Sequence, residues 1–103
     1  MTDPDLVRIA KALADPTRLG ILRTIAARGE VCCGDLWRAF PITAATVTHH
    51  LKVLDAAGLI DMRRDGQFIR VRAQRGTIDA YRAALGGAFE ADAPGPDRAR
   101  SSP

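Results

Sequence analysis

The stretch Thr43–Gly58, TAATVTHHLKVLDAAG, decides the fold of this 103-residue chain. One side of a helix over this stretch would be apolar, formed by Ala44, Val47, Leu51 and Leu54. The opposite side would carry Ala45, His49, Lys52 and Ala56. Thr43 can cap the first turn through its hydroxyl, and Gly58 can adopt the left-handed conformation that ends a helix. The stretch therefore predicts an amphipathic helix with defined ends.

The neighbouring segments predict what surrounds this helix. A shorter helical segment, 33–39, lies upstream and is separated from it by the compact break 40–42. Downstream, two β-prone runs, 59–64 and 67–72, flank an Asp-Gly pair, which is the strongest short-range signal for a hairpin. The sequence thus predicts a winged helix-turn-helix, mainly α with a small β-hairpin.

The polar side of the central helix suits DNA. Thr46, Thr48, His49 and Lys52 have side chains that reach base edges or phosphates from a helix in a major groove. An ordinary solvated helix face is the alternative. Adjacent histidines point about 100° apart on a helix, so His49 and His50 do not form a chelating i, i+4 pair.

The positive charge of the chain is concentrated in the same region. Residues 43–75 carry six Lys or Arg and three Asp or Glu, a surplus of three that equals the net charge of +3 of the whole chain. A nucleic-acid surface is expected where such a surplus lies, although a solvated basic face would look similar. At the hairpin, Arg63 and Arg64 flank the predicted turn at Asp65-Gly66, where they could lie along the phosphate backbone. The predicted DNA contacts are Thr43, Thr46, Thr48, His49, Lys52, Arg63, Arg64 and Arg70.

Four runs of the sequence resemble the ArsR/SmtB family of small dimeric bacterial repressors. They are ALADPTRL at 12–19, GEVCCGDL at 29–36, TVTHHLKVL at 46–54 and AGLI at 57–60. The resemblance extends from about Leu6 to Glu90. It implies a homodimer that binds a palindromic double-stranded DNA operator, and many members of the family release DNA when they bind a metal or are oxidised.

The terminal helices are the predicted dimer contact. Asp3-Pro4 and Asp15-Pro16 each resemble an N-cap followed by proline at the first helical position, which predicts helices over about 4–14 and 16–28. A last helix over about 77–90, the fifth, carries an apolar stripe that no later element covers. The resemblance implies that it pairs with the first and last helices of a second subunit. The predicted interface residues are Leu6, Ile9, Leu13, Ile78, Tyr81, Leu85 and Phe89.

Cys32 and Cys33 stand where the short helix 33–39 should begin. A helix N-terminus favours thiolate and hence reactivity, whereas a structural role as small apolar fillers is the alternative. A disulfide between them would be strained, because adjacent Cα atoms are only about 3.8 Å apart. We expect the short helix to brace the central helix through Leu36, Trp37 and Val47.

The ligand sets of metal-sensing relatives match this chain poorly. The arsenic and lead type has two cysteines with one residue between them, and here the second position is Gly34. The zinc and nickel type needs histidine on the last helix, where this chain offers only Asp79 and Glu90. We therefore predict no metal site and no cofactor. A redox or persulfide sensor at Cys32 and Cys33 is the preferred hypothesis; an atypical soft-metal sensor and the absence of cysteine-based sensing remain open.

The remaining predictions concern domains and location. Residues 1–90 should form one DNA-binding and dimerisation domain, and the tail 91–103, rich in Ala, Pro, Asp, Arg and Ser, should be disordered. The sequence has neither a membrane-length apolar run nor a signal-like N-terminus, which predicts a cytoplasmic protein without membrane contact. It also has no phosphate-binding loop and no nucleophile with a base, so we do not expect an enzyme.

Overall fold

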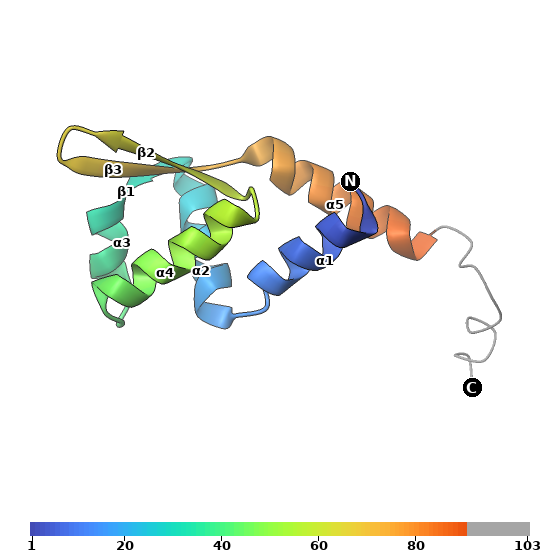
Figure 1. The fold of residues 1–103 in the computed structure, drawn as a ribbon, viewed down its shortest axis with the longest axis horizontal. Helices are drawn as coiled ribbons and strands as arrows, with labels where there is room; N and C mark the ends of the chain where they lie inside the picture. The colour runs from blue at the N-terminus through green and yellow to red at the C-terminus, as the bar shows by residue number, and fades with distance from the viewer. Residues whose placement is uncertain (91–103) are drawn as a thin grey trace.

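The computed structural model describes residues 1–90, which form five helices and a three-stranded sheet (Figure 1). In chain order they are α1 (Asp3–Ala12), α2 (Pro16–Arg28), β1 (Glu30–Cys32), α3 (Cys33–Ala39), α4 (Ala44–Ala56), β2 (Ile60–Asp65), β3 (Phe68–Ala73) and α5 (Arg75–Glu90). The predicted winged helix-turn-helix is confirmed: α3 and α4 form the helix-turn-helix, and β2 and β3 form the wing.

The ends of α4 follow the chemistry of its terminal residues. The Thr43 hydroxyl accepts a hydrogen bond from the Thr46 amide at 3.1 Å, which satisfies one of the unpaired donors of the first turn. Gly58 has a φ of 78°, a conformation that side chains rarely adopt, and the Leu59 amide then donates to the Leu54 carbonyl at 3.0 Å. Both predicted ends of this helix are confirmed.

The sheet has the order β1-β3-β2 and is antiparallel throughout. The strand β1 was not predicted, and it extends the hairpin into a three-stranded sheet by pairing Val31 with Val71. The turn of the hairpin consists of Gly66 and Gln67, one residue later than predicted, because Asp65 pairs with Phe68. Gly66, the first turn residue, has a φ of 64°. Glycine supplies that conformation without steric cost.

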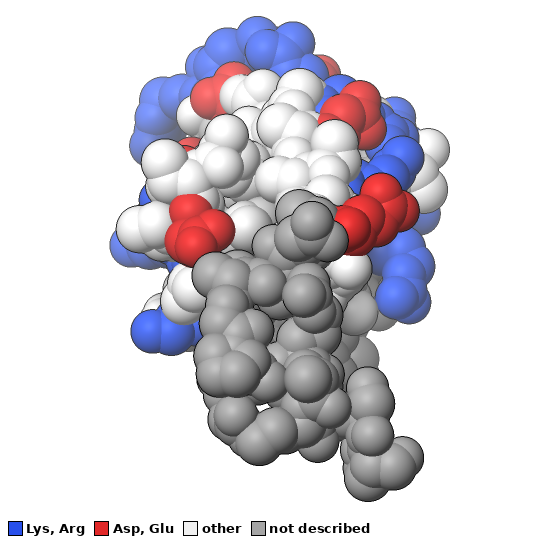
Figure 2. Space-filling view, turned by 90° about the vertical axis from the view of Figure 1, so that its right-hand side faces the viewer, with Lys and Arg blue, Asp and Glu red and all other residues white. Residues whose placement is uncertain are grey.

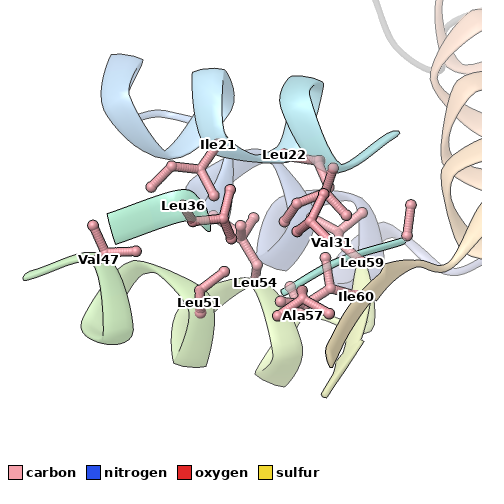
Figure 3. Close-up of a cluster of buried hydrophobic side chains, with 14 of the residues drawn as sticks. Ile21, Leu22, Val31, Leu36, Val47, Leu51, Leu54, Ala57, Leu59 and Ile60 are labelled. Atoms are coloured by element: carbon pink, nitrogen blue, oxygen red, sulfur yellow. The ribbon is translucent and has the colours of Figure 1, made fainter. Parts of the chain in front are cut away.

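One hydrophobic core lies between α2, α3, α4 and the sheet (Figure 3). From α4, the side chains of Val47, Leu51 and Leu54 point into it and are fully buried. Leu36 of α3 is also buried there, as predicted, but Trp37 is 42% exposed. The expected brace between α3 and α4 therefore does not include Trp37, because this residue of α3 faces outward.

The helices α1 and α5 pack against each other at the opposite end of the molecule (Figure 1). The N-cap of α1 is Thr2 rather than the predicted Asp3, because Thr2 and Asp5 form a reciprocal capping box. The N-cap of α2 is Asp15, as predicted, and its carboxylate accepts from the Arg18 amide at 2.9 Å. Between residues 1 and 90 no helix has the length and apolarity needed to cross a bilayer. The predicted disordered tail, 91–103, lies outside the described residues.

Candidate nucleic-acid interface

The outer face of α4 carries the polar side chains that were predicted to meet DNA. His49 and Lys52 are exposed, as are Ala45 and Ala56, so the predicted polar side is confirmed. Thr48 is half-buried. Ala44 is exposed rather than buried, because the part of α4 that packs on the core begins only at Val47.

Thr43 and Thr46 support the first turn of α4. Their hydroxyl oxygens lie 2.9 Å apart, and the Thr43 oxygen also accepts from the Thr46 amide. Both residues are exposed. They therefore hold the beginning of the helix while remaining accessible from solvent.

His50, the neighbour of His49, anchors α4 to the rest of the subunit. Its side chain is almost fully buried, and its Nδ1 lies 3.2 Å from Nη1 of Arg18. Because a guanidinium group only donates, Nδ1 accepts and the ring hydrogen belongs on Nε2, which lies 3.9 Å from the Asp15 carboxylate. Arg18 also donates to the Ala12 carbonyl at 2.6 Å. A single arginine thus joins the end of α1 and the start of α2 to the middle of α4.

This role of His50 was not predicted, although the sequence contains the signal for it. Positions 47, 50, 51 and 54 have the spacing of a buried helical stripe, and only His50 among them is polar. A buried polar side chain needs a partner, and Arg18 provides it. The hydrogen bond that the Arg18 amide donates to Asp15 lowers the pKa of the Asp15 carboxyl group, with the charge of the nearby Arg18 guanidinium acting in the same direction.

The wing separates its arginines onto two faces. On one face, Arg63 lies 3.6 Å from Glu30, Arg70 lies 2.9 Å from Asp65, and Arg72 lies 3.6 Å from Asp61. Arg64 is on the other face, opposite Ile69, and no partner within residues 1–90 forms an ion pair with it. Of the three arginines predicted to contact DNA, Arg63 and Arg70 are thus already paired with carboxylates. Arg64 keeps its charge available for phosphate.

The two cysteines differ in environment. Cys33 is 3% exposed, and burial, followed by the proximity of Cys32, raises the pKa of its thiol. The expectation that the helix start favours thiolate is therefore wrong for Cys33, because desolvation disfavours the charged form. Cys32 is half-buried and pairs across the sheet with Arg70. Both cysteines line a groove of about 400 Å³ between α3 and the wing, together with Trp37 and Phe68.

The predicted dimer contact is partly used within the subunit. Ile9 is completely buried in the core, so its place in the predicted interface was wrong: its side chain is not available to a partner. Leu13, Ile78 and Tyr81 are half-buried and pack against the core, and Leu6 is also half-buried.

The exposed apolar residues at this end come from both terminal helices. Leu85 and Phe89 on α5 are 37% and 82% exposed, and Val7 on α1, which was not predicted, is exposed as well. Figure 2 shows this end, with uncharged surface in the centre, acidic residues beside it and most basic residues at the rim.

The described residues contain no group of three or more His, Cys, Asp or Glu side chains close enough to hold a metal ion. In these residues, the second helix of the helix-turn-helix, α4, has one buried and one exposed face. The hairpin that follows it carries Arg64, which has no ion-pair partner within residues 1–90. These features define a winged helix-turn-helix protein.

Comparisons with known proteins place the chain in a family. Residues 13–63 match a family model described as a helix-turn-helix domain. The chain is 36% identical over 75 residues to the HTH-type transcriptional regulator YceK of Bacillus subtilis, covering 72% of this chain and 75% of that protein. It is 32% identical over 65 residues to a homologue of the cadmium resistance regulatory protein CadC of Staphylococcus aureus, covering 63% of this chain but only 54% of that relative.

Solved structures agree with these relatives. An ArsR-like transcriptional regulator from Rhodococcus sp. RHA1 superposes with a TM-score of 0.75 at 27% identity, covering 84% of this chain and 80% of that one. The homodimeric winged helix-turn-helix DNA-binding domain Mb0332 of Mycobacterium bovis has a TM-score of 0.68 at 25% identity, covering 90% and 92%. The chain belongs to the ArsR/SmtB family of winged helix-turn-helix transcriptional regulators.

Proposed function

We propose that this protein is a transcriptional repressor that binds a palindromic operator as a homodimer. The observation that carries the proposal is the division of α4 into two faces. Val47, Leu51 and Leu54 are fully buried, while His49 and Lys52 are exposed next to a wing whose Arg64 is free of ion pairs among residues 1–90. A helix held in this way presents a rigid polar face to a major groove.

The dimer follows from the exposed apolar residues of the terminal helices. Leu85 and Phe89 form a patch that water contacts in a single subunit, and a second copy would cover it. The homodimeric domain from M. bovis, which is similar over most of its length, supports this assembly. A two-fold dimer would present two copies of α4 to successive major grooves, about 34–36 Å apart.

Fluorescence anisotropy with the DNA upstream of the protein's own gene tests the proposal. We expect tight binding that weakens with salt, and weaker binding to a scrambled duplex of equal length. His49→Ala should reduce affinity for the cognate duplex by about 1–3 kcal/mol and affinity for the scrambled duplex much less, because His49 is proposed to contact a base. Asp55→Ala, on the same helix, is the control. Equal affinity for both duplexes would contradict an operator-binding function.

We further propose that the repressor responds to oxidants or persulfides at Cys32. This thiol is half-buried, lies in the groove between α3 and the wing, and pairs across the sheet with Arg70, so its modification would disturb the wing directly. Cys33 is buried and its raised pKa disfavours thiolate, which makes it a second partner for a bridge rather than the group attacked first.

The same binding assay separates the proposed signals. Oxidant or polysulfide should release DNA from the wild type, reductant should restore binding, and Cys32→Ser should remain bound throughout. Cys33→Ser is the matched control: because Cys32 remains, it should still be modified by oxidant, as mass spectrometry would detect. Release by arsenite alone would instead favour a soft-metal sensor. If no treatment released DNA, the cysteines would have no sensing role.

A further inference from the structure

A second basic surface adjoins the exposed face of α4 on the side of α1. A groove of about 410 Å³ runs between α1 and the second half of α4. Its cationic lining comes from Arg8, Lys11 and Arg18, and its apolar lining includes Val53 and Ala56. Of the described residues, no Asp or Glu lines it. We call it the α1–α4 groove.

Two of the three cations in the groove lack a carboxylate partner. Lys11 is exposed, and within residues 1–90 no carboxylate lies close enough to pair with its ammonium group. The Arg18 guanidinium donates to the Ala12 carbonyl and to His50, neither of which supplies a carboxylate charge. Arg8 is paired with Asp5 at 2.9 Å, so the unpaired charge of the groove comes from Lys11 and Arg18. The groove therefore keeps a positive charge that an anion can neutralise.

The position of the groove connects it to the proposed DNA surface. Lys52 and Val53 are adjacent on α4, and Ala56 belongs both to its exposed face and to the groove. The other wall is α1, which packs against α5 at the end proposed to meet a second subunit (Figure 1). In a two-fold dimer, each groove would thus lie between the two copies of α4, above the middle of the operator.

We propose that the α1–α4 groove binds the phosphates of the DNA backbone between the two half-sites, an inference that rests on the proposed function. Charge complementarity favours this occupant, because phosphate contacts are made mainly by Arg and Lys and need no base-reading groups. The small, exposed side chain of Ala56 allows a sugar-phosphate chain to approach the surface closely. Such contacts fix the spacing of the half-sites without reading their sequence.

Lys11→Ala tests this site with little risk to folding, because Lys11 is exposed and alanine is a good helix former. Because the dimer has one groove in each subunit, two contacts are lost: we expect the slope of log affinity against log salt to decrease by about 1.8, and affinity in 0.1 M salt to fall by about 25- to 100-fold on cognate and scrambled DNA alike. Lys11→Arg, which keeps the charge, should retain the wild-type slope. Arg23→Ala, which removes an exposed cation of α2 outside the groove, should also retain it.

Ethylation interference on the upstream duplex then locates the contact. In the wild type, ethylation of phosphates between the half-sites should inhibit binding; with Lys11→Ala this inhibition should disappear while inhibition near the wings persists.

An unchanged salt slope for Lys11→Ala would overturn the inference, and so would a dissociated dimer in sedimentation, because the groove would then be part of the subunit contact. If Arg64→Ala reduced the slope while Lys11→Ala did not, only this inference would fail. Absence of wild-type binding to any duplex would instead refute the proposed function.

Discussion

The apolar side chains are buried to different extents at the two ends of the molecule. From α2 to β3, which we call the body, each helix buries at least two side chains in the common core. In the arm, formed by α1 and α5, α1 also buries Ile9 and Ala12 in this core, but α5 has no buried residue over its 16 positions. Its stripe is half-buried at Ile78 and Tyr81, against the core, and exposed at Leu85 and Phe89.

This difference separates what folding requires from what assembly requires. A stripe that is covered within the subunit contributes to stability at any protein concentration. A stripe left in water contributes only when a second molecule covers it, at roughly 25 cal/mol for each Å² of apolar surface removed from water. We infer that the body holds the DNA-binding helix in place, whereas the arm joins two bodies.

The largest effect should come from a charge in the arm. Leu85→Asp should leave the helical content of the subunit nearly unchanged, because Leu85 is not part of its core, but should dissociate the dimer. DNA affinity should then fall by about 10²- to 10⁴-fold, since two bodies no longer bind as one molecule. Circular dichroism and anisotropy measure the two quantities. Arg82→Asp, at an already exposed polar position of α5, is the control. Loss of helicity in Leu85→Asp would mean that the arm is needed for folding itself.

A cavity in the body should produce the next largest effect. Leu54→Ala should lower the free energy of unfolding by about 2–5 kcal/mol at every protein concentration, because Leu54 is fully buried within the subunit. Phe89→Ala should act differently, with an effect that increases with protein concentration as the dimer forms. Urea denaturation at several concentrations distinguishes them. The same concentration dependence for both variants would remove the distinction between body and arm.

Within the body, the arginines on the two faces of the wing should differ in how much they contribute to DNA binding. Because the dimer has two wings, Arg64→Ala should decrease the salt slope by about 1.8 on every sequence, whereas Arg63→Ala should change it less, because Glu30 already pairs with Arg63. Salt titrations of both variants on cognate and scrambled DNA provide the measurement. An altered sequence preference with an intact slope for Arg64→Ala would contradict a phosphate contact.

The smallest effect is expected at the exposed N-terminus of the arm. The hydrogen bond from the Thr2 amide, together with contacts from Arg8 and the Thr2 hydroxyl, lowers the pKa of Asp5 to about 2. Because the folded pKa is below the unfolded one, Asp5 stabilises α1 fully above about pH 4, and this contribution is lost as the pH falls toward 2. Acid titration of Asp5→Asn, followed by circular dichroism, should lack this component. Asp3→Asn should retain it.

The sequence predicted those features that depend on local chemistry. The caps at Thr43 and Asp15, the glycines that end α2 and α4, and the buried stripe of α4 all follow from residue type and spacing along one helix. The strand β1 was missed because three residues carry too little periodicity, and its place is set by pairing with β3, some forty residues later.

The parts of the candidate site that could not be predicted depend on that long-range pairing. The register of β1 brings Glu30 beside Arg63 and Arg70, and of the arginines in the wing strands β2 and β3 only Arg64 then has no ion-pair partner within residues 1–90. In the same way, both cysteines line the groove between α3 and the wing, but Cys33 is buried in the core whereas Cys32 is only half-buried. From the sequence alone, Arg63 could not be distinguished from Arg64, nor Cys32 from Cys33. The fold places the two members of each pair in different environments.

Sedimentation velocity of the protein alone and bound to a labelled duplex from its own upstream region tests most directly whether the arm joins two DNA-binding bodies. We predict the mass of two chains in the free protein at micromolar concentration, and two chains on each operator duplex. A free protein with the mass of one chain, or one chain bound per operator with undiminished affinity, would contradict the account.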